Sequence, residues 1–208
     1  MIRLYDYFRS SASYRVRIAL NLKELDYERV AVNLLENGQK SDEYRARNPQ
    51  GLVPMLEVDG AQLTQSLSII DYLDRTRPEP PLVPANPVAA AHVRSMAQVV
   101  ASDIHPLNNL RVLHYLTDNL GHDKETRARW YAHWVREGFV ALEQLAARHG
   151  KEFLSGNLPG LADLCLVPQI YNARRFDISL DDFPTLLDYD ARANRLAAFQ
   201  AAHPDHID

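Results

Sequence analysis

At 208 residues, with 46% apolar and 24% charged residues, the chain has the composition of an ordinary globular protein with room for one large or two small domains. Its net charge of −4, without a basic tract, argues against nucleic acid as a partner, and no apolar run is long enough for a membrane span. The absence of an apolar leader before the first strand pattern predicts a cytoplasmic protein. Cys165 is the only cysteine, so a disulfide within the chain is excluded.

The first part of the chain mixes strand and helix patterns. The elements expected there, in order, are a strand at 1–7, a helix over 16–22, strands at 27–32, 55–58 and 62–63, and a helix beginning at Gln65-Ser66. The dipeptide Asp59-Gly60 is typical of a tight hairpin turn. The predicted order is therefore β-α-β followed by β-β-α.

The remainder of the chain contains only helical patterns and follows a proline-rich stretch. Five prolines crowd residues 78–87, which we interpret as an inter-domain linker. Beyond it, apolar residues recur at helical spacing without alternation, over 88–116, 125–148, 161–174 and 184–194. We therefore predict an α/β domain over residues 1–79 and an all-α domain over residues 80–208.

Serines cluster where the first helix begins, in the segment Arg9-Ser10-Ser11-Ala12-Ser13-Tyr14-Arg15-Val16-Arg17. A helix N-terminus carries unpaired N–H groups and partial positive charge, so a hydroxyl there either caps the helix or hydrogen-bonds a bound anion. Both possibilities stay open for Ser10 and Ser11. Because a thiolate is such an anion, this segment is a candidate thiol-handling site.

The serine segment is similar to the S-S-C-x-W/H-R-V-R signature of zeta-class glutathione transferases, and the resemblance extends over essentially the whole chain. The further motifs that carry it are Asn48-Pro49 through Val53-Pro54, Gln65-Ser66, Asp103-Ile104-His105-Pro106, Asn108-Asn109 with Arg111, and Ala162-Asp163-Leu164-Cys165-Leu166-Val167-Pro168-Gln169. The resemblance implies a thioredoxin-like domain followed by a helical domain, glutathione as cofactor and a homodimer. Members of this class are maleylacetoacetate isomerases, with maleylpyruvate isomerases among their bacterial relatives.

Several residues acquire expected roles toward glutathione. We expect the Ser10 hydroxyl to face its sulfur, with Ser11 as the alternative. Val53, before an expected cis Pro54, offers backbone groups to the cysteinyl unit. The remaining contacts implied by the resemblance are Gln65 and Ser66 for the γ-glutamyl carboxylate, Gln39 for the glycyl end, and His105 and Asn109. A plain helix cap stays open for Ser66, and a simple turn for Pro54.

The expected substrate carries two carboxylates, which guanidinium groups bind through paired hydrogen bonds. Arg9, Arg111 and Arg175 are the candidates, with Arg174 as a rival for the last. His105, Asn109 and Arg111 are expected on a single helical segment, kinked at Pro106. His105 could polarise the enol oxygen of the substrate, or only satisfy a core hydrogen bond.

Other features carry less chemistry. Asp163 is expected to act at a helix N-terminus where Gly160 replaces the usual capping hydroxyl. Trp130 and Trp134 share a helical face typical of core or interface residues. His203 and His206 make a poor metal site, so no metal is expected.

The family cysteine is replaced by Ala12, and the apolar setting of Cys165 indicates an inert thiol. The resemblance therefore implies a glutathione-dependent cis–trans isomerase acting on maleylacetoacetate, with glutathione as the source of the sulfur. The alternatives are a maleylpyruvate isomerase, a general glutathione transferase with a more apolar pocket, and a glutathione-binding module without turnover.

Overall fold

The structure is a computed structural model that describes residues 1–207. The chain divides into two compact units. The first comprises Met1–Leu82 together with the segment that starts at Asn194, and the second is Val83–Ala193.

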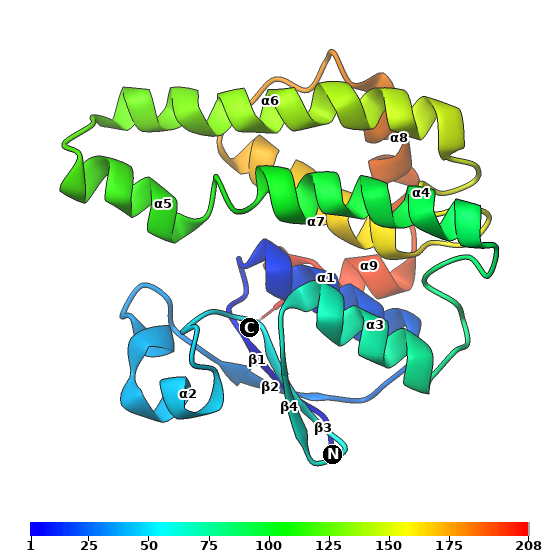
Figure 1. The fold of residues 1–208 in the computed structure, drawn as a ribbon, viewed down its shortest axis with the longest axis horizontal. Helices are drawn as coiled ribbons and strands as arrows, with labels where there is room; N and C mark the ends of the chain where they lie inside the picture. Colours follow the sequence, from blue (N-terminus) through cyan, green and yellow to red (C-terminus); the bar gives the residue numbers. More distant parts are fainter. Residues whose placement is uncertain (208) are drawn as a thin grey trace. The chain divides into compact units, whose positions relative to one another are not determined.

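A four-stranded mixed sheet forms the centre of the first unit (Figure 1). Its strands are β1 (Arg3–Asp6), β2 (Glu28–Ala31), β3 (Met55–Val58) and β4 (Ala61–Thr64), in the order β2-β1-β3-β4. β2 runs parallel to β1, whereas β3 is antiparallel to both of its neighbours. Between the paired residues Val58 and Ala61, Asp59 and Gly60 have φ of 52° and 79°. Two consecutive positive φ angles are the mark of a type I′ hairpin, which confirms the turn predicted from Asp-Gly.

Helices cover both faces of this sheet, and successive side chains of β1 point alternately to one face and the other. Leu4 and Asp6 share one face, where α1 (Ser11–Leu22) and α3 (Ser66–Thr76) pack together. Tyr5 points to the other face and packs against Tyr44 of the short helix α2 (Asp42–Arg47), which follows the 3-10 turn η1 (Gly38–Lys40). Neither α2 nor η1 was predicted, because segments this short carry no periodic signal.

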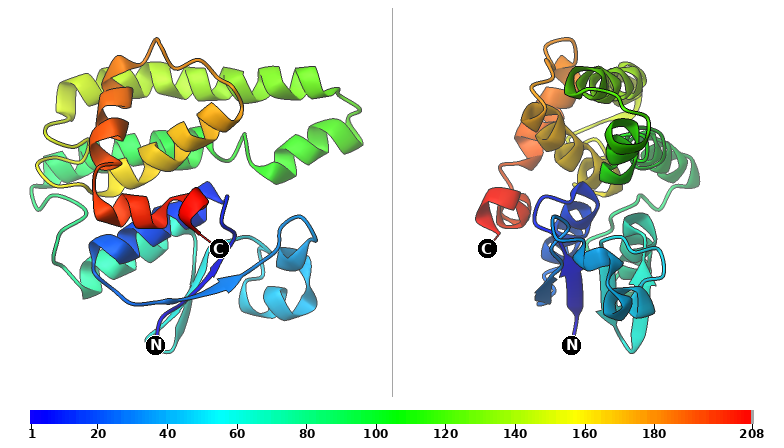
Figure 2. Two further views of the ribbon diagram at one scale, coloured as in Figure 1. Left: turned by 180° about the vertical axis from the view of Figure 1, so that it is seen from behind. Right: turned by 90° about the vertical axis from the view of Figure 1, so that its left-hand side faces the viewer.

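The C-terminal segment packs with the first unit, whereas the sequence placed it in the helical domain 80–208. Its helix α9 (Ala197–Ala202) lies beside α1, as Figure 2 shows, and η4 (Pro204–His206) follows. Asn21 Nδ2 donates to the Ala198 carbonyl at 3.0 Å. The pattern of 197–202 indicates a helix but does not indicate which domain that helix covers, because its partners are distant in sequence.

The second unit is helical in the part of the chain described. Its α-helices are α4 (Pro87–Gln98), α5 (Leu110–His114), α6 (Lys124–His149), α7 (Leu161–Arg175) and α8 (Pro184–Ala193). Trp130 and Trp134 of α6 pack edge to face, with 5.7 Å between ring centroids. Among the described residues, no helix combines the length and apolar character needed to cross a membrane.

The prediction of a single helix over 88–116 is wrong. After α4 the chain passes through the π-helical segment η2 (Val99–Ile104) and a turn, and only then enters α5 and the π-helical η3 (Tyr115–Asn119). Pro106 cannot donate a helical hydrogen bond, and Asn109 caps a new helix by accepting the Arg111 N–H at 3.1 Å. The helix therefore restarts, and it does not merely bend.

At the start of α7, Asp163 has the folding role predicted for it. Its carboxylate accepts the N–H groups of Gly160, Leu154 and Ser155 at 3.1, 2.8 and 3.0 Å. Burial raises the pKa of Asp163, and these hydrogen bonds oppose that shift. Ser155 supplies the hydroxyl that Gly160 lacks, because its Oγ accepts the Ala162 N–H at 2.9 Å. The cap is thus supplied from the preceding loop.

Candidate active site

The N-terminus of α1 is capped by Ser10, whose Oγ accepts the Ser13 N–H at 3.2 Å. A hydroxyl has two lone pairs and one proton, so capping leaves the proton available. Among residues 1–207, the Ser10 hydroxyl donates no hydrogen bond. Ser10 is half-buried, whereas Ser11 is only 4% exposed. Capping and anion binding, which the sequence left as alternatives, are therefore compatible at Ser10.

Arg9 directly precedes the cap and is exposed. Its guanidinium lies 4.9 Å from the ring centroid of Phe8, a cation–π distance. Such a contact holds the side chain loosely and leaves its five N–H donors able to bind a carboxylate.

The N-terminus of α3 is built differently. Gln65 occupies the N-cap position with φ of 67° and makes no side-chain cap bond, while its Nε2 donates to Gln50 Oε1 at 2.7 Å. Ser66 is the first residue of the helix, so the plain N-cap interpretation of Ser66 is wrong. Its buried hydroxyl accepts a bond from Arg15 Nη1 at 3.3 Å. Because a guanidinium only donates, this contact leaves the Ser66 proton available for a further acceptor. A positive φ outside glycine is uncommon, and strained backbone of this kind is enriched at functional sites.

The Val53–Pro54 peptide is cis, as predicted. The N–H and C=O groups of Val53 make no hydrogen bond within the described residues, so both are available to an extended peptide-like ligand. The preceding carbonyl, of Leu52, is held by Tyr44 Oη at 2.7 Å and Asn48 Nδ2 at 2.6 Å. From the sequence, Asn48 is included only as part of the Asn48-Pro49 motif, and Tyr44 is not identified.

Gln39 lies in η1, and its Oε1 is buried without a hydrogen-bond partner among the described residues. A buried amide oxygen without a donor is unfavourable, and a ligand N–H would satisfy it. Gly51, with φ of 60°, lies directly against this turn, because an added Cβ would come within 2.9 Å of the Gln39 carbonyl oxygen.

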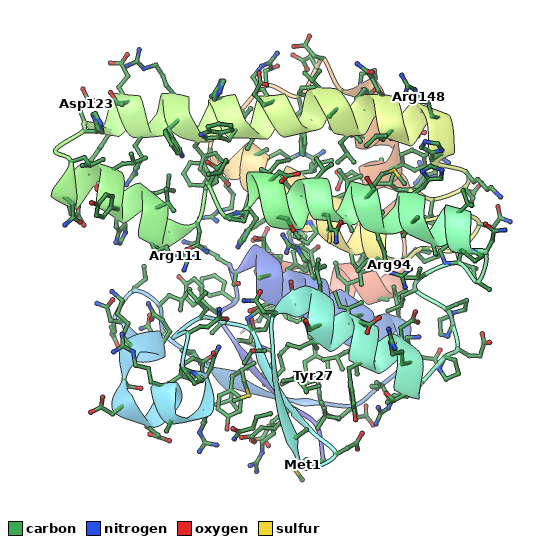
Figure 3. All side chains as sticks on the ribbon, viewed as in Figure 1. Met1, Tyr27, Arg94, Arg111, Asp123 and Arg148 are labelled. Atoms are coloured by element: carbon green, nitrogen blue, oxygen red, sulfur yellow. The ribbon has the colours of Figure 1, made fainter. Side chains whose placement is uncertain are left out.

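In the second unit, His105, Asn109 and Arg111 form one cluster, although not on one helix as predicted. Asn109 Nδ2 lies 3.4 Å from His105 Nε2, while Asn109 Oδ1 accepts the Arg111 N–H. Arg111 is exposed in the first turn of α5, where Figure 3 labels it. The Asn109 side chain therefore sets both the imidazole and the start of the helix that carries the guanidinium.

The two rivals at the end of α7 differ in their contacts. Arg174 Nη1 lies 2.7 Å from Oδ2 of Asp190, whose side chain is only 3% exposed, which gives Arg174 a structural partner. Arg175 contacts Asn172 Oδ1 at 3.3 Å and lies 5.8 Å from the Tyr171 ring centroid. These are weak, neutral contacts, so Arg175 is the better anion-binding candidate of the two.

Cys165, the chain's only thiol, is fully buried inside α7 at 0% exposure. Position 12, in the first turn of α1, carries the methyl group of Ala12. A sulfur nucleophile at the N-terminus of α1 must therefore come from a bound molecule.

Comparison with known proteins agrees with this geometry. Residues 4–81 match the family model described as Glutathione S-transferase, N-terminal domain. The maleylacetoacetate isomerase of Rhizobium meliloti (strain 1021) is 48% identical over 203 residues, which span 97% of this chain and 95% of that protein.

Two solved structures have the same fold over nearly their whole length. One, described as maleyl pyruvate isomerase, a bacterial glutathione-S-transferase in Zeta class, has a TM-score of 0.96 at 40% identity and covers 99% of this chain and 98% of its own. The other, maleylacetoacetate isomerase from Anaeromyxobacter dehalogenans 2CP-1 with bound dicarboxyethyl glutathione and citrate in the active site, has a TM-score of 0.89 at 41% identity. It covers 100% of this chain and 96% of its own.

The mixed sheet with its cis-proline loop and two helix N-termini, followed by a helical unit, defines a glutathione transferase. More narrowly, the chain belongs to the maleylacetoacetate isomerase family, the zeta class of these enzymes.

Proposed function

We propose that this protein is a glutathione-dependent isomerase that converts maleylacetoacetate to fumarylacetoacetate. The observation that carries the proposal is the Ser10 hydroxyl, which caps α1 through its oxygen and keeps its proton for a ligand, in a chain whose own thiol is buried. The relative from Rhizobium meliloti, named for this activity, supports the choice of substrate.

The first unit binds glutathione. The hydroxyl of Ser66 and the N-terminus of α3 bind the γ-glutamyl carboxylate, with Gln65 beside them. The backbone of Val53 pairs with the cysteinyl unit, and Gln39 Oε1 accepts an N–H from the glycyl end. Ser10 then lies against the sulfur.

The reaction is an addition followed by an elimination. The glutathione thiolate attacks one carbon of the cis double bond, whose π electrons move into the conjugated carbonyl to give an enolate. The remaining carbon–carbon bond is single and rotates. The enolate then collapses, re-forms the double bond as trans and expels the thiolate, so no atom or electron is gained or lost.

This chemistry needs an anionic sulfur at neutral pH, although a free thiol has a pKa of roughly 8.5. Lowering that value by about two units requires about 2.7 kcal/mol. A hydrogen bond to a charged acceptor contributes about 1.5–3 kcal/mol and a helix N-terminus about 0.3–1 kcal/mol. Together, the Ser10 hydroxyl and α1 contribute about 1.8–4 kcal/mol, a range that includes the required free energy.

The arginines recognise the carboxylates of the substrate. Arg9, Arg111 and Arg175 are exposed, and none of them has a charged partner among the described residues. The cluster of His105 with Asn109 stabilises the enolate oxygen. The relative from Anaeromyxobacter dehalogenans was solved with bound dicarboxyethyl glutathione, a glutathione derivative that carries two further carboxyl groups, which supports a diacid substrate.

Maleylpyruvate is the second candidate substrate, because the zeta-class structure with the TM-score of 0.96 is described as a maleylpyruvate isomerase. Its shorter chain keeps the same two carboxylates. We further propose that the enzyme is cytoplasmic and forms a homodimer; light scattering in solution would test the dimer.

The deciding experiment measures turnover of both diacids by absorbance, with and without glutathione, in the wild type and in Ser10→Ala. The matched control is Ser11→Ala, one residue further along. The proposal predicts turnover only with glutathione and a loss of about 10- to 100-fold in Ser10→Ala. Activity in enzyme freed of glutathione would refute the mechanism. If Ser11→Ala shows this loss and Ser10→Ala keeps wild-type activity, the role belongs to Ser11.

A further inference from the structure

Arg17 of α1 is fully buried, at 0% exposure, and its guanidinium ties together three separate parts of the first unit. Nη1 donates to both carboxylate oxygens of Asp6 at 2.8 and 2.9 Å, Nη2 to the Phe8 carbonyl at 3.0 Å, and Nε to the Ala202 carbonyl at 3.0 Å. These bonds use every nitrogen of the group, so its position is fixed from all sides.

The counter-ion of this arginine is a single buried carboxylate. Asp6 is itself fully buried and also accepts a bond from Arg29 Nε at 2.9 Å. A buried guanidinium is retained only where its charge and donors are satisfied, and here both conditions hold. The remaining bonds of Arg17 go to neutral carbonyls, so they serve to hold backbone.

One of these carbonyls belongs to the loop that carries the proposed catalytic serine. Asp6 ends β1 and Ser11 begins α1, so only four residues connect the strand to the helix. Arg17 holds this connection at its first end and at Phe8, two residues before Ser10. A further bond, from the Ser10 N–H to the Tyr7 carbonyl at 2.8 Å, completes the turn.

The other carbonyl ends α9, far away in sequence. Ala202 is the last residue of that helix, where unpaired carbonyls carry partial negative charge that a guanidinium stabilises. Arg17 therefore connects the serine loop with the C-terminal helix through a single side chain.

We propose that Arg17 is a positioning residue: it fixes the Phe8–Ser10 loop so that the Ser10 hydroxyl meets the sulfur of bound glutathione, and it makes that geometry depend on the docking of α9. This inference rests on the proposed function. A hydroxyl must be held within about 0.5 Å to stabilise a charge effectively, so a small relaxation of the loop weakens the stabilisation of the thiolate.

The test compares Arg17→Lys with a matched control, Asn21→Ala. Lysine keeps the charge beside Asp6 but has one nitrogen, so it cannot reach all the acceptors. Asn21→Ala removes a different side-chain bond between α1 and α9, from Asn21 Nδ2 to Ala198, without touching the serine loop. Arg17→Gln is a second variant, in which Asp6 keeps Arg29 as its ion-pair partner. Thermal melts establish that each variant is folded before kinetics are measured.

We expect the Arg17 variants to lose about tenfold in kcat and to show a pH–rate profile whose acidic limb moves up by about one unit, at nearly unchanged KM for glutathione. Asn21→Ala should keep the wild-type profile despite its lower stability. An active wild type whose Arg17 variants keep that profile would overturn the inference, and so would an equal shift in Asn21→Ala. A wild type without glutathione-dependent turnover would instead refute the proposed function.

Discussion

Replacing Tyr44 by phenylalanine should change the sign of its effect on stability between neutral and alkaline pH. Burial raises the pKa of Tyr44 to about 12 from the ordinary 10.0. The unfolded chain therefore releases the phenolic proton near pH 10 and the folded protein near pH 12, so stability is lost as the pH rises through this window. Two units correspond to at most about 3 kcal/mol, or about 2 kcal/mol once solvent screening is included.

At neutral pH the balance is the opposite. Tyr44 Oη donates to the Leu52 carbonyl at 2.7 Å, a bond worth about 1 kcal/mol net, and Asn48 still satisfies that carbonyl in the variant. Tyr44→Phe should therefore be about 1 kcal/mol less stable than the wild type at pH 7, equal to it near pH 11 and more stable above that. The stabilities of the variant and the wild type are measured by urea unfolding at a series of pH values. Parallel curves for the two proteins, with no crossing, would refute the reasoning.

Three further variants test other parts of the structure. Burial also raises the pKa of Tyr131, in the second unit, to about 12, so Tyr131→Phe should lose less unfolding stability than the wild type as the pH rises above 10. An equal loss of stability with pH in the variant and the wild type would contradict this. Lys23→Met should cost about 3–5 kcal/mol in urea unfolding, because Nζ is buried and lies 2.7 Å from Asp74 Oδ1; a cost under 1 kcal/mol would show that the pair is dispensable. Ser155→Ala should lower unfolding stability by about 1–2 kcal/mol through the uncapped Ala162 N–H, with Ser179→Ala in an exposed loop as the control.

The sheet, its hairpin and most helices follow from the sequence because their signals are local. Asp59-Gly60 specifies a turn by itself, and the helical spacing in α6 and α7 spans several turns. The break between η2 and α5 was only partly predicted. Pro106 indicated a kink, but the restart of the helix depends on Asn109. Because Asn109 lies within an apparent helical pattern, its role as a helix cap could not be recognised from the sequence.

The supporting residues of the candidate site could not be predicted, because their contacts join segments distant in sequence. Ser155 caps a helix from another loop, and Arg15 reaches Ser66 across 51 residues. Arg17 shows the same limit most clearly. Its place in the signature was recognised, whereas its bonds to Phe8 and Ala202 require the folded chain. Gln39, Gln65, Ser66 and Val53 were identified through the family resemblance, and their contacts with glutathione stay predictions.

The most direct test of this account is an ultraviolet titration of the glutathione thiolate bound to the enzyme, in the wild type and in Ser10→Ala. If the Ser10 hydroxyl and the N-terminus of α1 stabilise the borrowed sulfur, the bound thiol should ionise about two units below its value of roughly 8.5 in water. In Ser10→Ala it should return at least one unit of the way toward that value, a change of about 1.4 kcal/mol. A bound thiol that titrates as it does in water, or one that Ser10→Ala leaves unchanged, would contradict the account.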